Sequence, residues 1–263
     1  MLRKLLKYDL KWIYKTIVIF YIIAFIFALL TRILGSIDNS LLCHILASIC
    51  GIISITIIIV SLINTIIRAY IRFIRNMYKD EAYLTHTLPI ERKTIYLSKV
   101  LASLISVFTT VIFIILCIFI CYYSKENLEI MTNMIKITAN NYNTTVLNLL
   151  FIISIIIFLE IMFVLLIGYV GIIIGHKSNT QKQVKSIMWG FGLYLGTSLI
   201  NLLVILIFGL FNNNIMNIIK TSDTIDINAI KSLLYLFIIL YLIYDCIYYF
   251  IGKKELSLGI NID

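Results

Sequence analysis

The stretch LLCHILASICGIISITIIIVSLINTII, residues 41–67, contains no aspartate, glutamate, lysine, arginine or proline. About 20 consecutive apolar residues are enough for a helix to cross the hydrocarbon core of a bilayer. This stretch is longer than that requirement, and similar apolar runs recur along the chain. The sequence therefore predicts an all-α polytopic membrane protein.

Five further apolar runs complete a set of six expected transmembrane helices. The six spans are expected at about 16–34, 41–67, 96–122, 146–174, 187–211 and 229–250. Of the 263 residues, 61% are hydrophobic and 13% are charged, whereas charged residues make up about 25% of a soluble domain. No segment between the spans is long enough for a folded domain, so residues 1–263 are expected to form a single transmembrane domain.

The basic residues are distributed unevenly between the segments that connect these spans. Most of the 22 lysines and arginines lie before span one, between spans two and three, between spans four and five, and after span six. These segments share one side of the membrane, and the positive-inside rule makes that side cytoplasmic. Both termini are therefore expected in the cytoplasm. The net charge of +9 reflects this asymmetry, and no nucleic-acid partner is expected because the chain has no soluble basic face.

The N-terminal segment MLRKLLKYDLKWIYK, residues 1–15, separates apolar and basic side chains onto opposite faces of a helix. A cationic amphipathic helix of this kind lies in the plane of the headgroups, with membrane lipids as partners; a plain basic flank of span one is the alternative. Asp9 lies on the apolar face, where an unpaired carboxylate is costly. We therefore expect Asp9 to contact Arg68, Arg72 or Arg75.

Span one is expected to be retained rather than cleaved as part of a signal peptide. The basic segment before it extends to Lys15, the apolar run is long, and no small-residue cleavage site follows.

Four cations follow span two at spacings of four, three and four residues, which places Arg68, Arg72, Arg75 and Lys79 on one helical face. A voltage sensor carries its arginines inside a span, whereas this series begins where the apolar run ends. The pattern therefore indicates a helix that continues beyond the bilayer, with its basic face near anionic headgroups.

The segment after these cations is expected to form a short helix at about residues 79–88. Asp80 and Glu81 precede AYLTHTLP, which ends at Pro89, the single proline of the chain. Proline disfavours helix for the residue before it and suits the first turn of a new helix. A short helix on a hairpin can dock against a partner, while an ordinary connector is the alternative reading.

The stretch EAYLTHTLPIERKTIYLSKVLASL, residues 81–104, is similar to a loop of ABC-2 type transporter permeases, the membrane subunits of bacterial ABC exporters. The segment LLKYDLKWIYK and the six-span layout with both termini inside also resemble that family. The resemblance implies that residues 1–15 form the elbow helix and that residues 79–88 form a coupling helix, which docks on a cytoplasmic ABC ATPase. The residues implied to face the ATPase are Asp80, Glu81, Tyr83, Leu84, Thr85, His86 and Thr87.

The same resemblance implies a function in the plasma membrane. The chain would be a permease subunit that pairs with a second permease, itself or a sister chain. It would move a hydrophobic or amphipathic substrate outward, such as an antimicrobial peptide, a drug or a lipid-like molecule. ATP and Mg²⁺ would be bound by the partner ATPase, and no cofactor by this chain.

Four polar residues inside the expected spans are candidates for a role in transport. Spans two and five line the path between the two permeases in the family, which implies this role for Ser61, Asn64 and Asn201. Glu160 falls near the middle of span four, where an ionisable group is a functional candidate because its ionised form is expensive. A protonated Glu160 that hydrogen-bonds a neighbouring helix is the alternative.

The chain carries no sequence signature of a catalytic or metal site. It has no H-E-x-x-H, G-x-S-x-G or G-x-x-x-x-G-K-[ST] motif, and its five cysteines form no C-x-x-C pair. No metal ligand and no catalytic residue are therefore expected, and any ATP hydrolysis must come from a partner. A secondary transporter or channel, or a membrane immunity or sensor protein, remains the alternative function.

Two groups of glycines predict a close helix crossing. Gly168, Gly171 and Gly175 end span four, and Gly190, Gly192 and Gly196 begin span five. Each group includes a G-x-x-x-G, which lets two helix backbones approach closely.

Overall fold

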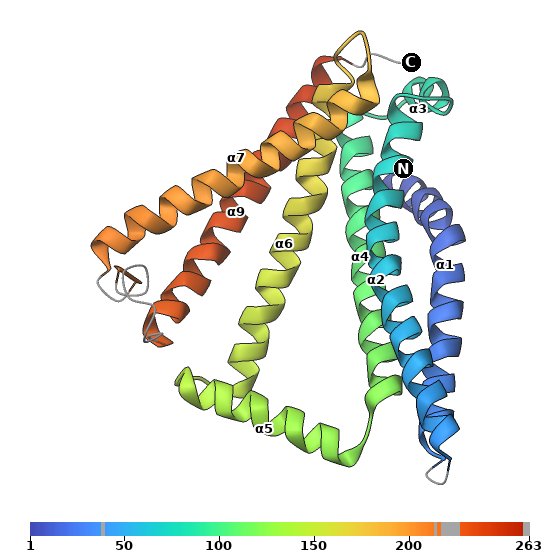
Figure 1. Cartoon of the computed structure of the whole chain (residues 1–263). Helices are drawn as coiled ribbons and strands as arrows, with labels where there is room; N and C mark the ends of the chain where they lie inside the picture. Colours follow the sequence, from blue (N-terminus) through green and yellow to red (C-terminus); the bar gives the residue numbers. More distant parts are fainter. Residues whose placement is uncertain (38–39, 213–214, 217–226, 260–263) are drawn as a thin grey trace. The chain divides into compact units, whose positions relative to one another are not determined.

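The computed structural model of the chain describes residues 1–37, 40–212, 215–216 and 227–259. The ordered elements in these residues are helices, with no strand among them, as Figure 1 shows. They are α1 (Leu2–Gly35), α2 (Leu41–Met77), α3 (Ala82–Thr87), α4 (Arg92–Tyr122), α5 (Lys125–Asn141), α6 (Val146–Gly175), α7 (Lys182–Phe211) and α9 (Ile227–Leu258).

Six of these helices are long and apolar enough to cross a membrane: α1, α2, α4, α6, α7 and α9. Each contains one of the six spans expected from the sequence, so the prediction of a polytopic all-helical membrane protein is confirmed at this level. The connection between spans five and six, residues 212–228, lies largely outside the described residues.

A separate in-plane helix was expected for residues 1–15. The structure has no break between this segment and span one. The segment forms the first turns of α1, which continues without interruption from Leu2 to Gly35. Residues 2–34 contain neither proline nor glycine, so nothing in the sequence breaks the backbone hydrogen bonds between the basic segment and the span. Figure 1 shows these first turns bending away from the rest of the helix.

The short helix after α2 is present but shorter than expected. The prediction placed it at about residues 79–88, and α3 has six residues, Ala82–Thr87. Leu88 is extended, with φ −67° and ψ 138°, because Pro89 sterically disfavours the helical conformation in the residue before it.

The described chain forms two compact units. The first, residues 1–130, packs α1 against α2 and α4 and also joins α2 to α4. Hydroxyl groups link these helices: Tyr21 Oη lies 2.6 Å from Thr110 Oγ1, which lies 3.0 Å from Thr65 Oγ1. Such hydrogen bonds help to hold helices together in lipid. Apolar packing between helices gives little driving force there, because the acyl chains that it displaces are equally apolar.

The second unit begins at Met131 and packs α6 against α7 and α9. A Cβ atom built on Gly171 would lie 2.6 Å from the Gly190 backbone, and one on Gly175 would lie 2.3 Å from the Ser186 backbone. The predicted close crossing therefore exists, with Ser186 in place of a third glycine. A Cβ atom on Gly192 or Gly196 would meet nothing within 4 Å, and neither glycine is among the atoms nearest to Gly171 and Gly175.

The crossing of α6 and α7 gives a test with an internal control. We expect Gly175→Ala to lower the melting temperature in detergent by several degrees, because the added methyl group overlaps the Ser186 backbone and overpacking costs about 1–3 kcal/mol. Gly196→Ala makes the same chemical change on the open face of α7 and should leave the melting temperature unchanged. Equal effects of the two substitutions would contradict the crossing.

Candidate functional site

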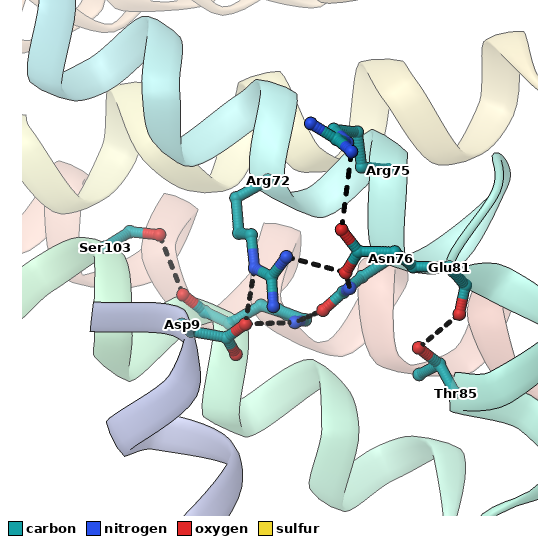
Figure 2. Close-up of polar contacts among 8 residues, drawn as sticks. Asp9, Arg72, Arg75, Asn76, Glu81, Thr85 and Ser103 are labelled. Carbon is teal, nitrogen blue, oxygen red and sulfur yellow. Dashed lines mark hydrogen bonds and ion pairs between the residues drawn. The ribbon is translucent and has the colours of Figure 1, made fainter. Parts of the chain in front are cut away.

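Five polar side chains meet in the first unit, where α1, α2, α4 and the loop before α3 come together. We call Asp9, Arg72, Asn76, Glu81 and Lys99 the buried polar cluster. Figure 2 shows how Asp9, Arg72, Asn76 and Glu81 face one another. Their exposed fractions are 2% for Asp9, 3% for Lys99, 6% for Asn76 and 9% for Arg72. Glu81 is only partly buried and lies at the edge of the cluster.

Asp9 receives two charged donors through one carboxylate oxygen. Arg72 Nε lies 2.8 Å from Asp9 Oδ1, and Lys99 Nζ lies 2.6 Å from the same oxygen. Of the three arginines expected as candidates for this contact, Arg72 is the one that makes it. Because Lys99 belongs to α4, Asp9 joins α1 to both α2 and α4.

Arg72 also reaches the second carboxylate of the cluster. Its Nη1 lies 2.7 Å from Glu81 Oε2, so one guanidinium bridges Asp9 and Glu81. Asn76 donates its amide to Glu81 and accepts a hydrogen bond from Lys99. Arg75 Nη2 lies 3.7 Å from Glu81 Oε1 and is more exposed, so it contributes less than Arg72.

The buried charges of the cluster balance. Two carboxylates, Asp9 and Glu81, face two buried cations, Arg72 and Lys99. Buried ions of this kind gain little net stability over apolar residues, but loss of one partner leaves a charge without compensation. The cluster therefore contributes more to selecting one arrangement of its helices than to the stability of that arrangement.

Helical periodicity explains why these residues meet. Arg72 and Asn76 are four residues apart on α2 and therefore share a face. On α4, Tyr96, Lys99 and Ser103 follow the same three- and four-residue spacing and are all buried. The expectation for Asp9 considered only the arginines of α2, and it missed Lys99 and Asn76. A lysine at a core-facing position of an apolar span was the available signal for Lys99.

Trp12 covers the arginine series from the side of α1. The guanidinium carbons of Arg68, Arg72 and Arg75 lie 5.6, 5.5 and 5.7 Å from the centre of its ring. Cations at this distance from an indole face are attracted by its negative quadrupole. Arg68 therefore approaches α1 through Trp12, whereas Arg72 also pairs with Asp9.

Short hydrogen-bonded links attach α3 to the end of α2. Thr85 Oγ1 donates to the carbonyl of Glu81 at 2.8 Å, and His86 Nε2 lies 3.2 Å from the carbonyl oxygen of Met77. Tyr78, at the turn between the helices, is buried, and desolvation raises the pKa of its phenol above the ordinary value. Tyr78 therefore stays neutral in this turn.

The residues expected to face an ATPase divide into two groups. Tyr83 is 65% exposed and Leu84 is 73% exposed, and Asp80 and Thr87 are also exposed. Glu81 instead turns toward Arg72, Thr85 is only 8% exposed, and His86 is intermediate. The polar group of Glu81 binds Arg72 of α2 and that of Thr85 binds the carbonyl of Glu81, so these two residues present less of their side chains to a partner than Tyr83 and Leu84 do.

The polar residues considered for a transport path lie in different surroundings. Ser61 is 1% exposed and donates to the carbonyl of Ile58 in its own helix, so it lines no open surface of the first unit. Asn64 is intermediate in exposure. Asn201 accepts a hydrogen bond of 2.9 Å from the Tyr244 hydroxyl and lines a groove of about 310 Å³ between α7 and α9.

Two carboxyl groups of the second unit stand apart from any ion pair among the described residues. Glu160 is exposed on α6, and both it and Asp245 are close enough to Tyr241 to interact electrostatically. Asp245 is 4% exposed, and neither of its oxygens has a hydrogen-bond partner in the described structure. No group of three or more metal-binding side chains occurs in the described part of the chain.

Comparison with known proteins adds no relative. No protein-family model, curated protein or solved structure matches the chain.

The buried polar cluster predicts strong coupling between Asp9 and Lys99. Asp9→Asn leaves Lys99 without its ion-pair partner, and Lys99→Met leaves two carboxylates, Asp9 and Glu81, with one buried cation, Arg72. Each single substitution should cost about 3–5 kcal/mol of stability, because it leaves a buried charge without full compensation. The double variant removes both charges, so its loss should be smaller than the sum of the single losses. Thermal unfolding of the purified protein in detergent measures all three.

Asp245→Asn is the matched control for Asp9→Asn. It makes the same chemical change at a buried carboxyl that has no partner among the described residues, and we expect little effect on the melting temperature. Additive losses in the double variant, or a loss at Asp245 as large as at Asp9, would contradict this account of the cluster.

Proposed function

We propose that the chain is the permease subunit of an ATP-driven exporter and that α3 is the element that docks on a separate cytoplasmic ATPase. The proposal is supported by two features of α3, its exposed apolar side chains and its attachment to α2. Tyr83 and Leu84 are largely exposed, while Glu81, directly before the helix, is bound to Arg72 of α2.

Exposed aromatic and aliphatic side chains on a short helix suit a protein interface. Most of the binding energy of such interfaces comes from a few apolar anchors that fill pockets on the partner. Tyr83 and Leu84 are adjacent in sequence, and Asp80 and Thr87 add polar groups beside them. These four residues form the docking surface that we propose.

The buried polar cluster supplies the mechanical part of the proposal. A force applied to α3 reaches Glu81 and, through Arg72 and Asp9, the helices α2 and α1. Lys99 extends the same connection to α4. Closure of the ATPase upon ATP binding would in this way move three membrane helices together, with the first turns of α1 acting as the elbow helix.

The remaining parts of the proposal follow from this assignment. The chain lies in the plasma membrane with both termini in the cytoplasm and pairs with a second permease subunit. ATP and Mg²⁺ are bound by the ATPase, and the substrate is a hydrophobic or amphipathic molecule moved outward. The even number of apolar spans and the basic charge of the α2–α4 connection support this orientation.

Affinity purification in a mild detergent, followed by identification of the chains that co-purify, tests the proposal. We expect an ATPase with a phosphate-binding loop to co-purify, and we expect the variant Tyr83→Ala with Leu84→Ala to lose at least ten-fold of it. Tyr8→Ala is the matched control, because Tyr8 is also 65% exposed but lies on α1. It should retain the ATPase.

Either of two results would overturn the proposed function. The first is that the chain purifies without an ATPase and moves substrate along an ion gradient. The second is that the α3 variant and the Tyr8 variant retain the ATPase equally. The first result would favour a secondary transporter or channel, and the second would place the docking surface elsewhere.

A further inference from the structure

The helix α5, between α4 and α6, was not expected from the sequence and has no role in the proposed function. It has 17 residues, Lys125–Asn141, and is about 25 Å long at 1.5 Å per residue. Unlike the six spans, it is not apolar enough to cross a membrane. Its place in the chain and its side chains show what it contacts.

Both ends of α5 are close to the ends of membrane-spanning helices. Only Tyr123 and Ser124 separate it from α4, and residues 142–145 separate it from α6. A fully extended residue covers about 3.3–3.6 Å, so neither end of α5 can move far from the membrane surface. A helix held at both ends in this way lies along that surface.

Hydrogen bonds keep both connections compact. At the start of α5, Asn127 Nδ2 donates to the carbonyl of Tyr122 at 2.9 Å. At its end, the Thr144 amide donates to the carbonyl of Ala139 at 2.9 Å, and Asn143 takes a left-handed conformation with φ 47°. The Thr145 hydroxyl then caps α6 by accepting from the Asn148 amide.

The charged side chains of α5 lie on one face. At 100° per residue, the apolar side chains fall on one side of the helix and the charged ones on the other. The apolar side holds Leu128, Ile130, Met131, Met134, Ile135, Ile137 and Ala139, together with the uncharged polar residues Asn127, Thr138 and Asn141, and the polar side holds Lys125, Glu126, Glu129, Thr132, Asn133, Lys136 and Asn140. The side chains of Asn127 and Thr138 donate to the backbone carbonyls of Tyr122 and Met134. Such a division of charged and apolar side chains is typical of helices that lie in the interface of a bilayer.

Protein contacts leave most of the apolar side open. Met131 and Met134 are each 62% exposed, Ile137 is 58% exposed and Ile130 is 46% exposed. Exposed apolar area of this extent beside water would be unusual for a stable surface. The bilayer provides a cover because α4 and α6 place this helix at its boundary.

We infer that α5 is an interfacial helix that inserts its apolar side into the lipid leaflet at which α4 ends and α6 begins. The acyl-chain boundary of that leaflet covers the apolar side of α5, and the polar side faces the headgroups and water. This inference depends on the spans but not on the proposed exporter function, so either can fail alone.

A labelling experiment with matched positions tests the inference. Single cysteines are introduced as Asn133→Cys on the polar side and as Met131→Cys or Met134→Cys on the apolar side. All three positions are exposed in the chain itself, so a difference between them reports the membrane. Reaction with a charged, water-soluble maleimide is followed in open membrane fragments, where both surfaces are accessible, with the parent chain giving the background from its five native cysteines.

We expect the cysteine at 133 to react at least ten-fold faster than those at 131 and 134, and all three to react equally after unfolding in dodecyl sulfate. Equal rates in the membrane would overturn the inference, because α5 would then protrude into water. Slow reaction at all three positions would overturn it as well, because the helix would then be covered on both sides.

A second measurement separates a lipid cover from a protein cover. The cysteines at 133 and 134 are labelled with bimane, and the protein is reconstituted into vesicles with brominated acyl chains. We expect quenching of the label at 134 and little quenching at 133. A label at 134 that is protected from maleimide but not quenched by brominated lipid would show that protein covers the apolar side, and the inference would fail.

Discussion

The guanidinium of Arg72 is the point on which the first unit depends. It binds one carboxylate on each side, the buried Asp9 at 2.8 Å and the partly buried Glu81 at 2.7 Å. A buried carboxylate without a cation, or a buried guanidinium without an anion, would be costly at this depth. The first turns of α1, the end of α2 and the start of the α3 loop are therefore positioned together, and Lys99 adds α4 to the same arrangement.

Much of this architecture could be predicted because its signals are local. The length of each apolar run determines a span, so all six appear where the sequence indicates them. The position of Asp9 on an apolar face required a cation, and a structure was needed to choose Arg72 among three arginines. The choice depends on the angle and distance at which α1 passes α2, and no local pattern encodes these.

Other features could not be predicted because they depend on which neighbour fills each position. The glycine pattern indicated a close crossing of α6 and α7, but neither Gly192 nor Gly196 is among the atoms nearest to Gly171 and Gly175, and Ser186 takes part instead. Similarly, Thr85 and Glu81 have the polarity of surface residues, yet Thr85 binds the carbonyl of Glu81 and Glu81 binds Arg72 of α2. The helix α5 was not predicted because its lysines and glutamates make it too polar for a span.

The order of the cluster residues along the chain has a consequence for membrane insertion. Asp9, Arg72 and Lys99 arrive on three successive apolar helices, and the last arrives with the third. Until α4 is in the membrane, Asp9 and Arg72 have an incomplete set of partners, and both remain better solvated near water than in lipid. The Asp9–Arg72 pair needs only α1 and α2, but the pair between Asp9 and Lys99 needs α4 as well. The complete set of ion pairs can therefore form only after all three helices have been inserted.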